Sequence, residues 1–225
     1  MAKPLTITID ATRRVSGLLL APADARAGYV VAHGAGAGMA HPFMAAAATG
    51  LAARGIATLR YQFPYMERGS RRPDGPRVAH ATVRAAVDEA ARQLPGLTLL
   101  AGGKSFGGRM TSQAQAGSPL PGVHGLMFLG FPLHPAGKPS DERAAHLSDV
   151  AVPMLFLQGT RDELADTDLL QSLVRGLGER ATLQLIADAD HSFHVPARSG
   201  RKDAEVMSEM LDVVAAWIAH RLSMP

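Results

Sequence analysis

The stretch LTLLAGGKSFGGRMT, at positions 97–111, constrains the fold of this chain most. A short apolar run ends at paired glycines, and positions 103–107 then fill the pattern Gly-x-Ser-x-Gly around Ser105. This pattern is typical of the nucleophile elbow, a sharp turn from a buried strand into a helix whose positions two before and two after the serine must lack bulk. It predicts that Ser105 stands at a strand end and a helix N-terminus, where the partial positive charge favours a developing anion.

Two other glycine-rich patterns are incomplete, so neither of them predicts a nucleotide-binding site. The sequence GKS at positions 103–105 ends like a phosphate-binding P-loop, but that loop needs a glycine at position 98, which is Thr98. The sequence GAGAG at positions 34–38 begins like a dinucleotide fingerprint, but its third glycine would fall at Met39. No cofactor is therefore expected.

The composition excludes several classes of protein. With 225 residues, 47% of them hydrophobic and 19% charged, the chain is expected to form a single domain over residues 1–225 rather than a disordered chain. No apolar run approaches the ~18 residues of a membrane span, and the first residues do not resemble a secretory signal, so a cytoplasmic protein without membrane contact is expected. The absence of cysteine leaves only oxygen or nitrogen as a nucleophile.

The charge pattern does not predict nucleic-acid binding. The net charge is +3, from 23 basic and 20 acidic residues, and basic residues are not concentrated on one element between aromatic side chains. The one local cluster is Arg68, Arg71 and Arg72. We interpret it as a solvated loop, with a contact to an anionic substrate or partner as the alternative. The oligomeric state is not predicted.

Strand-like and helix-like segments alternate along the chain. An opening antiparallel pair is expected at 5–9 and 15–20, followed by strands at 29–32, 56–61, 97–101, 123–129, 152–157 and 182–186. Helices are expected at 42–54, 76–94, 106–116, 140–147, 167–176 and 203–222. The alternation predicts an α/β fold with a mainly parallel sheet and helices on both faces, in which chemistry gathers beyond the carboxyl ends of the strands. In the last helix an apolar stripe is predicted to face the core, at Val206, Met210, Val213, Val214, Trp217 and Ile218.

A base and a carboxylate follow Ser105 in the order that the elbow requires. A serine hydroxyl needs a base to accept its proton, and the elbow predicts the order Ser, Asp or Glu, His. Asp162 follows the predicted strand at 152–157, and His191 follows the strand at 182–186. We predict that Ser105 attacks a carbonyl, that His191 removes and returns the proton, and that Asp162 orients the imidazole and stabilises its cation.

Neighbouring acids and a second histidine offer alternatives. Glu163, Asp166 and Asp168 compete with Asp162, but they lie further into the loop and the start of a helix, where acids favour the positive N-terminus. His194, near Asp188 and Asp190, suggests a metal cluster, but the spacing lacks the two-histidine helical geometry of zinc proteases, and a solvated loop is preferred. No metal is therefore expected.

The predicted reaction needs two donors for the oxyanion that forms on the substrate carbonyl. One is the backbone N–H after the nucleophile, at Phe106. The other is expected from the glycine-rich loop after the strand at 29–32, where we predict the backbone N–H of Ala35.

With these residues in view, the chain resembles the α/β-hydrolase superfamily, in its dienelactone-hydrolase-like branch. More closely, it is similar to the small hydrolase group related to testis-expressed protein 30 and NSL complex subunit 3. The resemblance covers positions 30–195 and rests on six blocks of sequence: HGAGAGMAHPFM, RYQFPYME, AGGKSFGGRM, FLGFPLHPAGKP, LFLQGTRDELA and ADHSF.

The resemblance implies an eight-stranded sheet without a substantial cap domain, with Ser105, Asp162 and His191 as the triad. Ser105 stands where true dienelactone hydrolases have a cysteine, which favours a simple ester, of short or medium acyl length, as the small-molecule substrate. Candidates for substrate binding near the strand ends are His41, Phe63, Tyr65, Phe131, Leu133 and His134. Whether the loop at 62–75 acts as a lid stays open.

Three functional classes follow from these observations. The first is a serine hydrolase of carboxylic esters that forms an acyl-enzyme. A thioesterase or a peptidase on the same triad is the second, because the triad handles any acyl group. The third is a catalytically idle interaction domain, which the resemblance to a chromatin-complex subunit suggests and the intact triad opposes.

Overall fold

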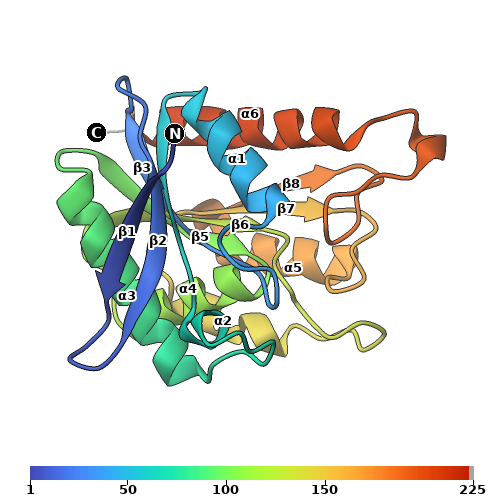
Figure 1. Ribbon diagram of the computed structural model, residues 1–225. Helices are drawn as coiled ribbons and strands as arrows, with labels where there is room; N and C mark the ends of the chain where they lie inside the picture. Colours follow the sequence, from blue (N-terminus) through green and yellow to red (C-terminus); the bar gives the residue numbers. More distant parts are fainter. Residues whose placement is uncertain (223–225) are drawn as a thin grey trace.

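The structure is a computed structural model that describes residues 1–222, and its centre is one twisted sheet (Figure 1). The sheet has eight strands in the order β1-β2-β4-β3-β5-β6-β7-β8. β1 pairs with β2 and β2 with β4 antiparallel, and all the other pairs are parallel, so the predicted mainly parallel sheet is confirmed. The strands are β1 (Lys3–Thr8), β2 (Arg14–Leu20), β3 (Ala27–Ala32), β4 (Ile56–Tyr61), β5 (Thr98–Lys104), β6 (Val123–Leu129), β7 (Met154–Gly159) and β8 (Ala181–Ile186).

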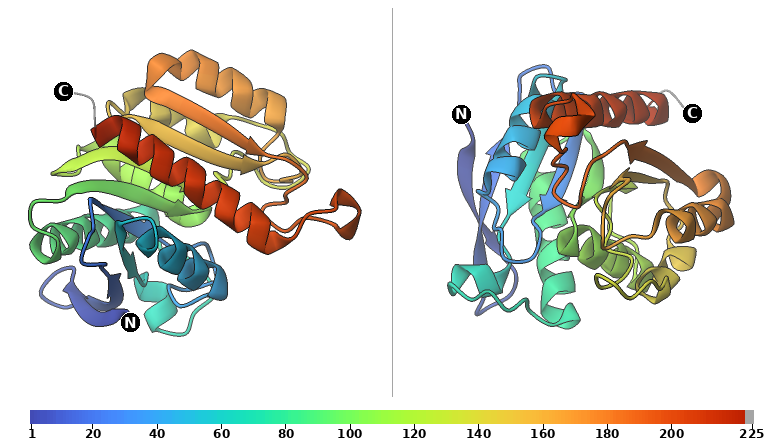
Figure 2. Two further views of the ribbon diagram at one scale, coloured as in Figure 1. Left: turned by 90° about the horizontal axis from the view of Figure 1, so that it is seen from above. Right: turned by 90° about the vertical axis from the view of Figure 1, so that its right-hand side faces the viewer.

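Helices cover both faces of the sheet and create two apolar cores (Figure 2). One core lies under α1 (Pro42–Ala52) and α6 (Asp203–Leu222). The other lies under α3 (Pro76–Gln93), α4 (Phe106–Gly117) and α5 (Thr167–Leu177). Among the elements of residues 1–222, none forms a cap domain over the sheet. The remaining short helices are α2 (Pro64–Glu67), η1 (Glu142–Asp149), η2 (Gly178–Arg180) and η3 (Ala197–Ser199).

The closing helix α6 presents the apolar stripe that the sequence predicts. Val206, Met210, Val214, Trp217 and Ile218 are all buried, and Val213 packs against the same core while keeping partial exposure. Within residues 1–222, no helix combines the length and the apolar character that crossing a membrane would need.

Three local details differ from the sequence-based expectations. Strand β5 continues past the apolar run at 97–101 to Lys104, because Gly102 and Gly103 extend it. The segment at 140–147 was expected to form an α-helix, but a 3₁₀ helix forms at Glu142–Asp149. The loop at 62–75 contains the one-turn helix α2, which begins at Pro64, a residue suited to the first turn.

The turn from β5 into α4 depends on close backbone contacts. A Cβ atom on Gly103 would lie 2.2 Å from the carbonyl oxygen of Ala32, and one on Gly107 would lie 2.6 Å from that same oxygen. These distances are shorter than van der Waals contact, so α4 reaches the sheet only with glycine at both positions. By contrast, a Cβ on Gly117, at the other end of α4, would meet no atom within 4 Å.

We expect Gly107→Ala to lower the free energy of unfolding by about 1–3 kcal/mol, because the added methyl group overpacks the contact with β3. Gly117→Ala, in the same helix, should be neutral or slightly stabilising, since alanine has the higher helix propensity. Urea denaturation of both variants measures the difference. Equal stability of the two variants would contradict the proposed contact.

Candidate active site

Ser105 lies between β5 and α4 in a strained backbone conformation. Its φ angle is +50°, and positive φ values at residues other than glycine cost about 1–3 kcal/mol and cluster at functional sites. The backbone N–H of Ser105 donates to the carbonyl of Leu129 on the adjacent strand at 3.2 Å, which fixes the turn. The sequence-predicted elbow is therefore present, and it exposes the hydroxyl at the carboxyl edge of the sheet.

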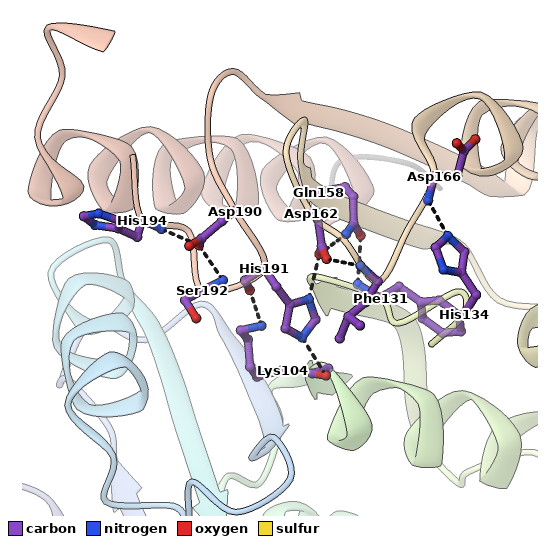
Figure 3. Close-up of polar contacts among 12 residues, drawn as sticks. Lys104, Phe131, His134, Gln158, Asp162, Asp166, Asp190, His191, Ser192 and His194 are labelled. Carbon is purple, nitrogen blue, oxygen red and sulfur yellow. Dashed lines mark hydrogen bonds and ion pairs between the residues drawn. The ribbon is translucent and has the colours of Figure 1, made fainter. Parts of the chain in front are cut away.

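The structure brings His191 and Asp162 to Ser105 from two other strand ends (Figure 3). His191 Nε2 lies 2.8 Å from Ser105 Oγ, and His191 Nδ1 lies 2.7 Å from Asp162 Oδ2. The Asp162 side chain is fully buried, whereas that of His191 is 25% exposed. Because an ionised carboxylate only accepts hydrogen bonds, Nδ1 carries the proton and Nε2 is left to accept from the serine hydroxyl.

Gln158, the penultimate residue of β7, holds the carboxylate in place. Its side-chain amide donates to Asp162 Oδ2, and its amide oxygen accepts from the backbone N–H of Phe131 at 2.9 Å. The backbone N–H of Leu164 donates to the other carboxylate oxygen at 2.8 Å. The sequence analysis missed Gln158; its polar side chain within an otherwise apolar strand, four residues before Asp162, was the available signal.

The loop after β3 leaves backbone donors free, among them the N–H of Ala35 beside Ser105. The N–H of Gly36 donates to the Tyr65 hydroxyl at 3.2 Å, and that of Ala37 donates to the carbonyl of Gly34 at 3.3 Å. In the part of the chain that the structure describes, the N–H of Ala35 has no acceptor, and Ala35 lines the cavity in front of Ser105. The N–H of Phe106, at the first position of α4, likewise has no acceptor among the described residues.

His33 braces the start of this loop from inside the protein. Its Nδ1 lies 2.7 Å from the carbonyl oxygen of Gly34, and its Nε2 accepts from the backbone N–H of Phe63 at 3.1 Å. This pattern requires the neutral ring with the proton on Nδ1. Burial lowers the pKa of His33, which favours the same neutral form.

A cavity of about 360 Å³ opens in front of Ser105. It lies between the loop before α1 and the loop that carries His191. No residue of the loop at 62–75 lines it, so that loop is not a lid in this structure. The lining residues are Gly34, Ala35, Ala37, His41, Phe43, Met44, Lys104, Ser105, Leu164, His191 and Ser192.

Of the six residues expected to contact substrate, only His41 lines the cavity. Phe63, Tyr65, Phe131 and Leu133 are fully buried in the core on the α3 and α4 side, so their expected place at the cavity wall is wrong. The physical reason is that these rings and side chains turn back under the sheet, where aromatic neighbours pack edge to face.

His134, the sixth candidate, is also buried and does not line the cavity. Its Nε2 accepts from the backbone N–H of Asp166 at 2.8 Å, and its Nδ1 lies 2.8 Å from the carbonyl of Pro135. It therefore ties the loop after β6 to the loop that carries Asp162. Proximity to strand ends identified the loops correctly, but it did not reveal the direction of the side chains.

Asp166, one of the competing acids, and His194 have structural partners. Asp166 caps α5 by accepting from the backbone N–H groups of Asp168 and Leu169. His194 Nδ1 lies 2.8 Å from Asp203 Oδ2, and this hydrogen bond raises the pKa of His194. Among residues 1–222 there is no group of three or more His, Asp or Glu side chains that could hold a metal ion.

The arginine cluster lies away from the cavity. Arg68 pairs with Asp74 at 2.8 Å, and Asp74 also accepts from the backbone N–H of Tyr65. Arg71 and Arg72 are exposed. This agrees with the interpretation of the cluster as a solvated loop, in which one ion pair helps to hold Tyr65.

Comparisons with known proteins agree with this architecture. A family model described as "Alpha/beta hydrolase domain" matches residues 25–219. A dienelactone hydrolase from Anabaena variabilis is similar with a TM-score of 0.76 and 20% identity, over 98% of this chain and 97% of that chain. A serine hydrolase without a lid from Xanthomonas campestris gives 0.73 and 23%, over 96% and 94%. The esterase domain of a Rhodothermus marinus protein gives 0.73 and 16%, over 96% and 97%.

We expect Gln158→Leu to lower the free energy of unfolding by about 2–4 kcal/mol, because it leaves the buried N–H of Phe131 without an acceptor and removes a donor from Asp162. Gln184→Leu is the matched control. Gln184 stands on the neighbouring strand β8, and its amide donates only to the carbonyl of Leu185, at 3.2 Å. Its substitution should cost less than about 1 kcal/mol. Urea denaturation compares them, and equal costs would contradict a bracing role for Gln158.

Proposed function

This chain belongs to the alpha/beta hydrolase domain family, and from that premise we propose that it is a serine hydrolase that cleaves carboxylic esters. The observation that carries the proposal is the continuous line of hydrogen bonds from the buried Asp162 through His191 to Ser105, which lines a cavity. A serine hydroxyl becomes a nucleophile only when such a base accepts its proton.

In the proposed reaction, Ser105 Oγ attacks the ester carbonyl while its proton moves to His191 Nε2. Asp162 stabilises the imidazolium cation that forms. The negative oxygen of the tetrahedral intermediate accepts from the free N–H groups of Ala35 and Phe106. His191 then returns the proton to the leaving alcohol, which departs and leaves an acyl group on Ser105. Water attacks this acyl-enzyme by the same steps in reverse order and releases the acid.

The cavity wall favours a short or medium acyl group. Ala37, Phe43, Met44 and Leu164 provide its apolar surface, and about 360 Å³ accommodates a small chain rather than a polymer. Thioesters and amides are the alternatives on the same machinery. The esterase domain among the structural neighbours supports the ester.

One finer assignment rests on the sequence. We infer, from the RYQFPYME and FPLHPAGKP segments, a closer relation to the group of testis-expressed protein 30 and NSL complex subunit 3. The small-molecule ester is the one partner that we propose.

We expect Ser105→Ala and His191→Ala to lower kcat by about 10⁴-fold or more, and Asp162→Ala to lower it somewhat less, because the three residues act as a unit. The measurement is the hydrolysis of p-nitrophenyl esters with acyl chains of about two to twelve carbons. Wild-type turnover no greater than that of Ser105→Ala across the whole series would remove the esterase assignment.

A fluorophosphonate probe separates the enzyme from a catalytically idle interaction domain. We expect the probe to label wild-type protein at Ser105 and to leave Ser105→Ala unlabelled, because only an activated hydroxyl reacts. Labelling is read by mass spectrometry of the intact protein and its peptides. Well-folded wild-type protein that stays unlabelled would favour the idle domain.

Tyr65 offers a test of the oxyanion loop. We expect Tyr65→Phe to lower kcat about 10-fold with little change in KM, because it frees the Gly36 N–H and loosens the loop, and loss of a whole oxyanion donor costs about 10²- to 10³-fold. Tyr61→Phe is the control, since Tyr61 is equally buried and its hydroxyl makes no hydrogen bond to that loop. Equal kcat values for the two variants in steady-state kinetics would contradict this role of the Tyr65 hydroxyl.

A further inference from the structure

Lys104, the last residue of β5, donates to the loop that carries His191 (Figure 3) and also lies beside the glycines that open the loops after β3 and β6. Its Nζ donates to the backbone carbonyl of His191 at 2.6 Å and lies 5.5 Å from the centre of the Phe193 ring. Its Cγ lies 3.5 Å from the point where a Cβ on Gly34 would stand, beside the proposed oxyanion loop. One side chain thus connects the nucleophile strand with the loops of Ala35 and His191.

The loop after β6 leaves room for this side chain. A Cβ on Gly130 would lie 3.1 Å from Lys104 Nζ and 3.5 Å from His191 Nδ1. The ammonium group and the imidazole therefore border the same small space, which only glycine keeps open. Gly130 also has a φ angle of +72°, a conformation that other residues rarely adopt.

The ammonium group of Lys104 is desolvated but forms no ion pair within residues 1–222. The residue keeps partial exposure where it lines the cavity, but its ammonium group is largely desolvated, and this lowers the pKa of Lys104 to about 8. Asp162 and Asp190 act against this shift through their charges. Within residues 1–222, no carboxylate oxygen lies within 4.0 Å of Nζ. A side chain needed only for packing would be less costly here without a charge.

The loop that carries His191 needs an attachment at that residue. Two of its residues have positive φ angles, Asp188 at +59° and Phe193 at +64°. Asp190 organises the loop internally by accepting from the N–H groups of Ser192 and His194, but these bonds do not reach the sheet. The bond from Lys104 joins the backbone of His191 itself to the strand that carries Ser105.

We propose that Lys104 is a positioning residue for the base of the proposed reaction: its ammonium group holds the backbone of His191, so that the imidazole stays beside Ser105. This inference rests on the proposed function. The ionisable groups that face Lys104 are Asp162, Asp190 and His191, with His41 also on the cavity wall. A base that is already held in line with the serine hydroxyl accepts its proton without first having to be oriented.

The test compares Lys104→Met, which keeps the length of the side chain but removes the charge and the donor, with Lys104→Arg, which keeps both. Lys202→Met, at an exposed lysine, is the control. The first readout is the NMR resonance of the His191 Nδ1 proton, which reports the hydrogen bond to Asp162 and does not depend on turnover. The second is kcat and KM for p-nitrophenyl acetate, and the third is thermal unfolding.

In Lys104→Met, we expect the resonance of the His191 Nδ1 proton to broaden or disappear, because the backbone of His191 is no longer held and the ring loses its fixed place beside Asp162. We expect kcat to fall about 10- to 100-fold through loss of alignment, with KM within a few-fold. Lys104→Arg should restore the resonance and most of kcat, and Lys202→Met should match the wild type. The melting temperature of Lys104→Met should be unchanged or higher, since a desolvated charge is gone.

An unchanged resonance of the His191 Nδ1 proton in Lys104→Met would overturn the proposal, whatever the activity of that variant. A lower melting temperature together with an unchanged resonance would make Lys104 a packing residue. If wild-type protein cleaves no ester and resists the fluorophosphonate probe, the proposed function fails, but the resonance still decides whether Lys104 positions His191.

Discussion

Close backbone contact at the carboxyl edge of the sheet is the constraint on which the rest of the structure depends. A Cβ on Gly102 would lie 1.9 Å from the carbonyl oxygen of Met127, and one on Gly103 would lie 2.2 Å from that of Ala32, so β5 fits between its neighbours only if these two positions lack side chains. The same holds for Gly159 at the end of β7, where a Cβ would lie 2.3 Å from the carbonyl oxygen of Ala189. These contacts bring the chain segments before Ser105, Asp162 and His191 close enough for their side chains to meet.

That constraint also explains how much the sequence could predict. Strand positions follow from the periodicity of the sequence. Because parallel strands end at one edge of a sheet, the sequence also predicts that Ser105, Asp162 and His191 lie close together. The direction of loop side chains does not follow from such rules. Phe63 and Phe131 come directly after β4 and β6, but tertiary packing turns both into the core. Met44 and Leu164, which line the cavity, carry no local pattern that distinguishes them from core residues.

Three residues that the sequence analysis missed bind other groups of the protein. The side-chain amide of Gln158 bonds to Asp162 and to the backbone of Phe131. His33 bonds to the backbone through both ring nitrogens, and Lys104 donates to a backbone carbonyl. These partners lie across the fold from each residue. Apart from the polar Gln158 within its apolar strand, no local spacing in the sequence indicates them, whereas the hydrogen bonds in the structure show them directly.

The uncovered carboxyl edge of the sheet also determines how water reaches the cavity. Because no part of residues 1–222 forms a cap over Ser105, and the His191 side chain is 25% exposed, water enters the cavity until a ligand displaces it. For the ester substrate that we propose, the acyl chain supplies the apolar cover that a lid would provide, by packing between Phe43, Met44 and Leu164. Each methylene buried there contributes about 0.8 kcal/mol until the chain outgrows the cavity, after which further carbons stay in water. The proposed function therefore couples acyl length to the exclusion of water through one small apolar wall.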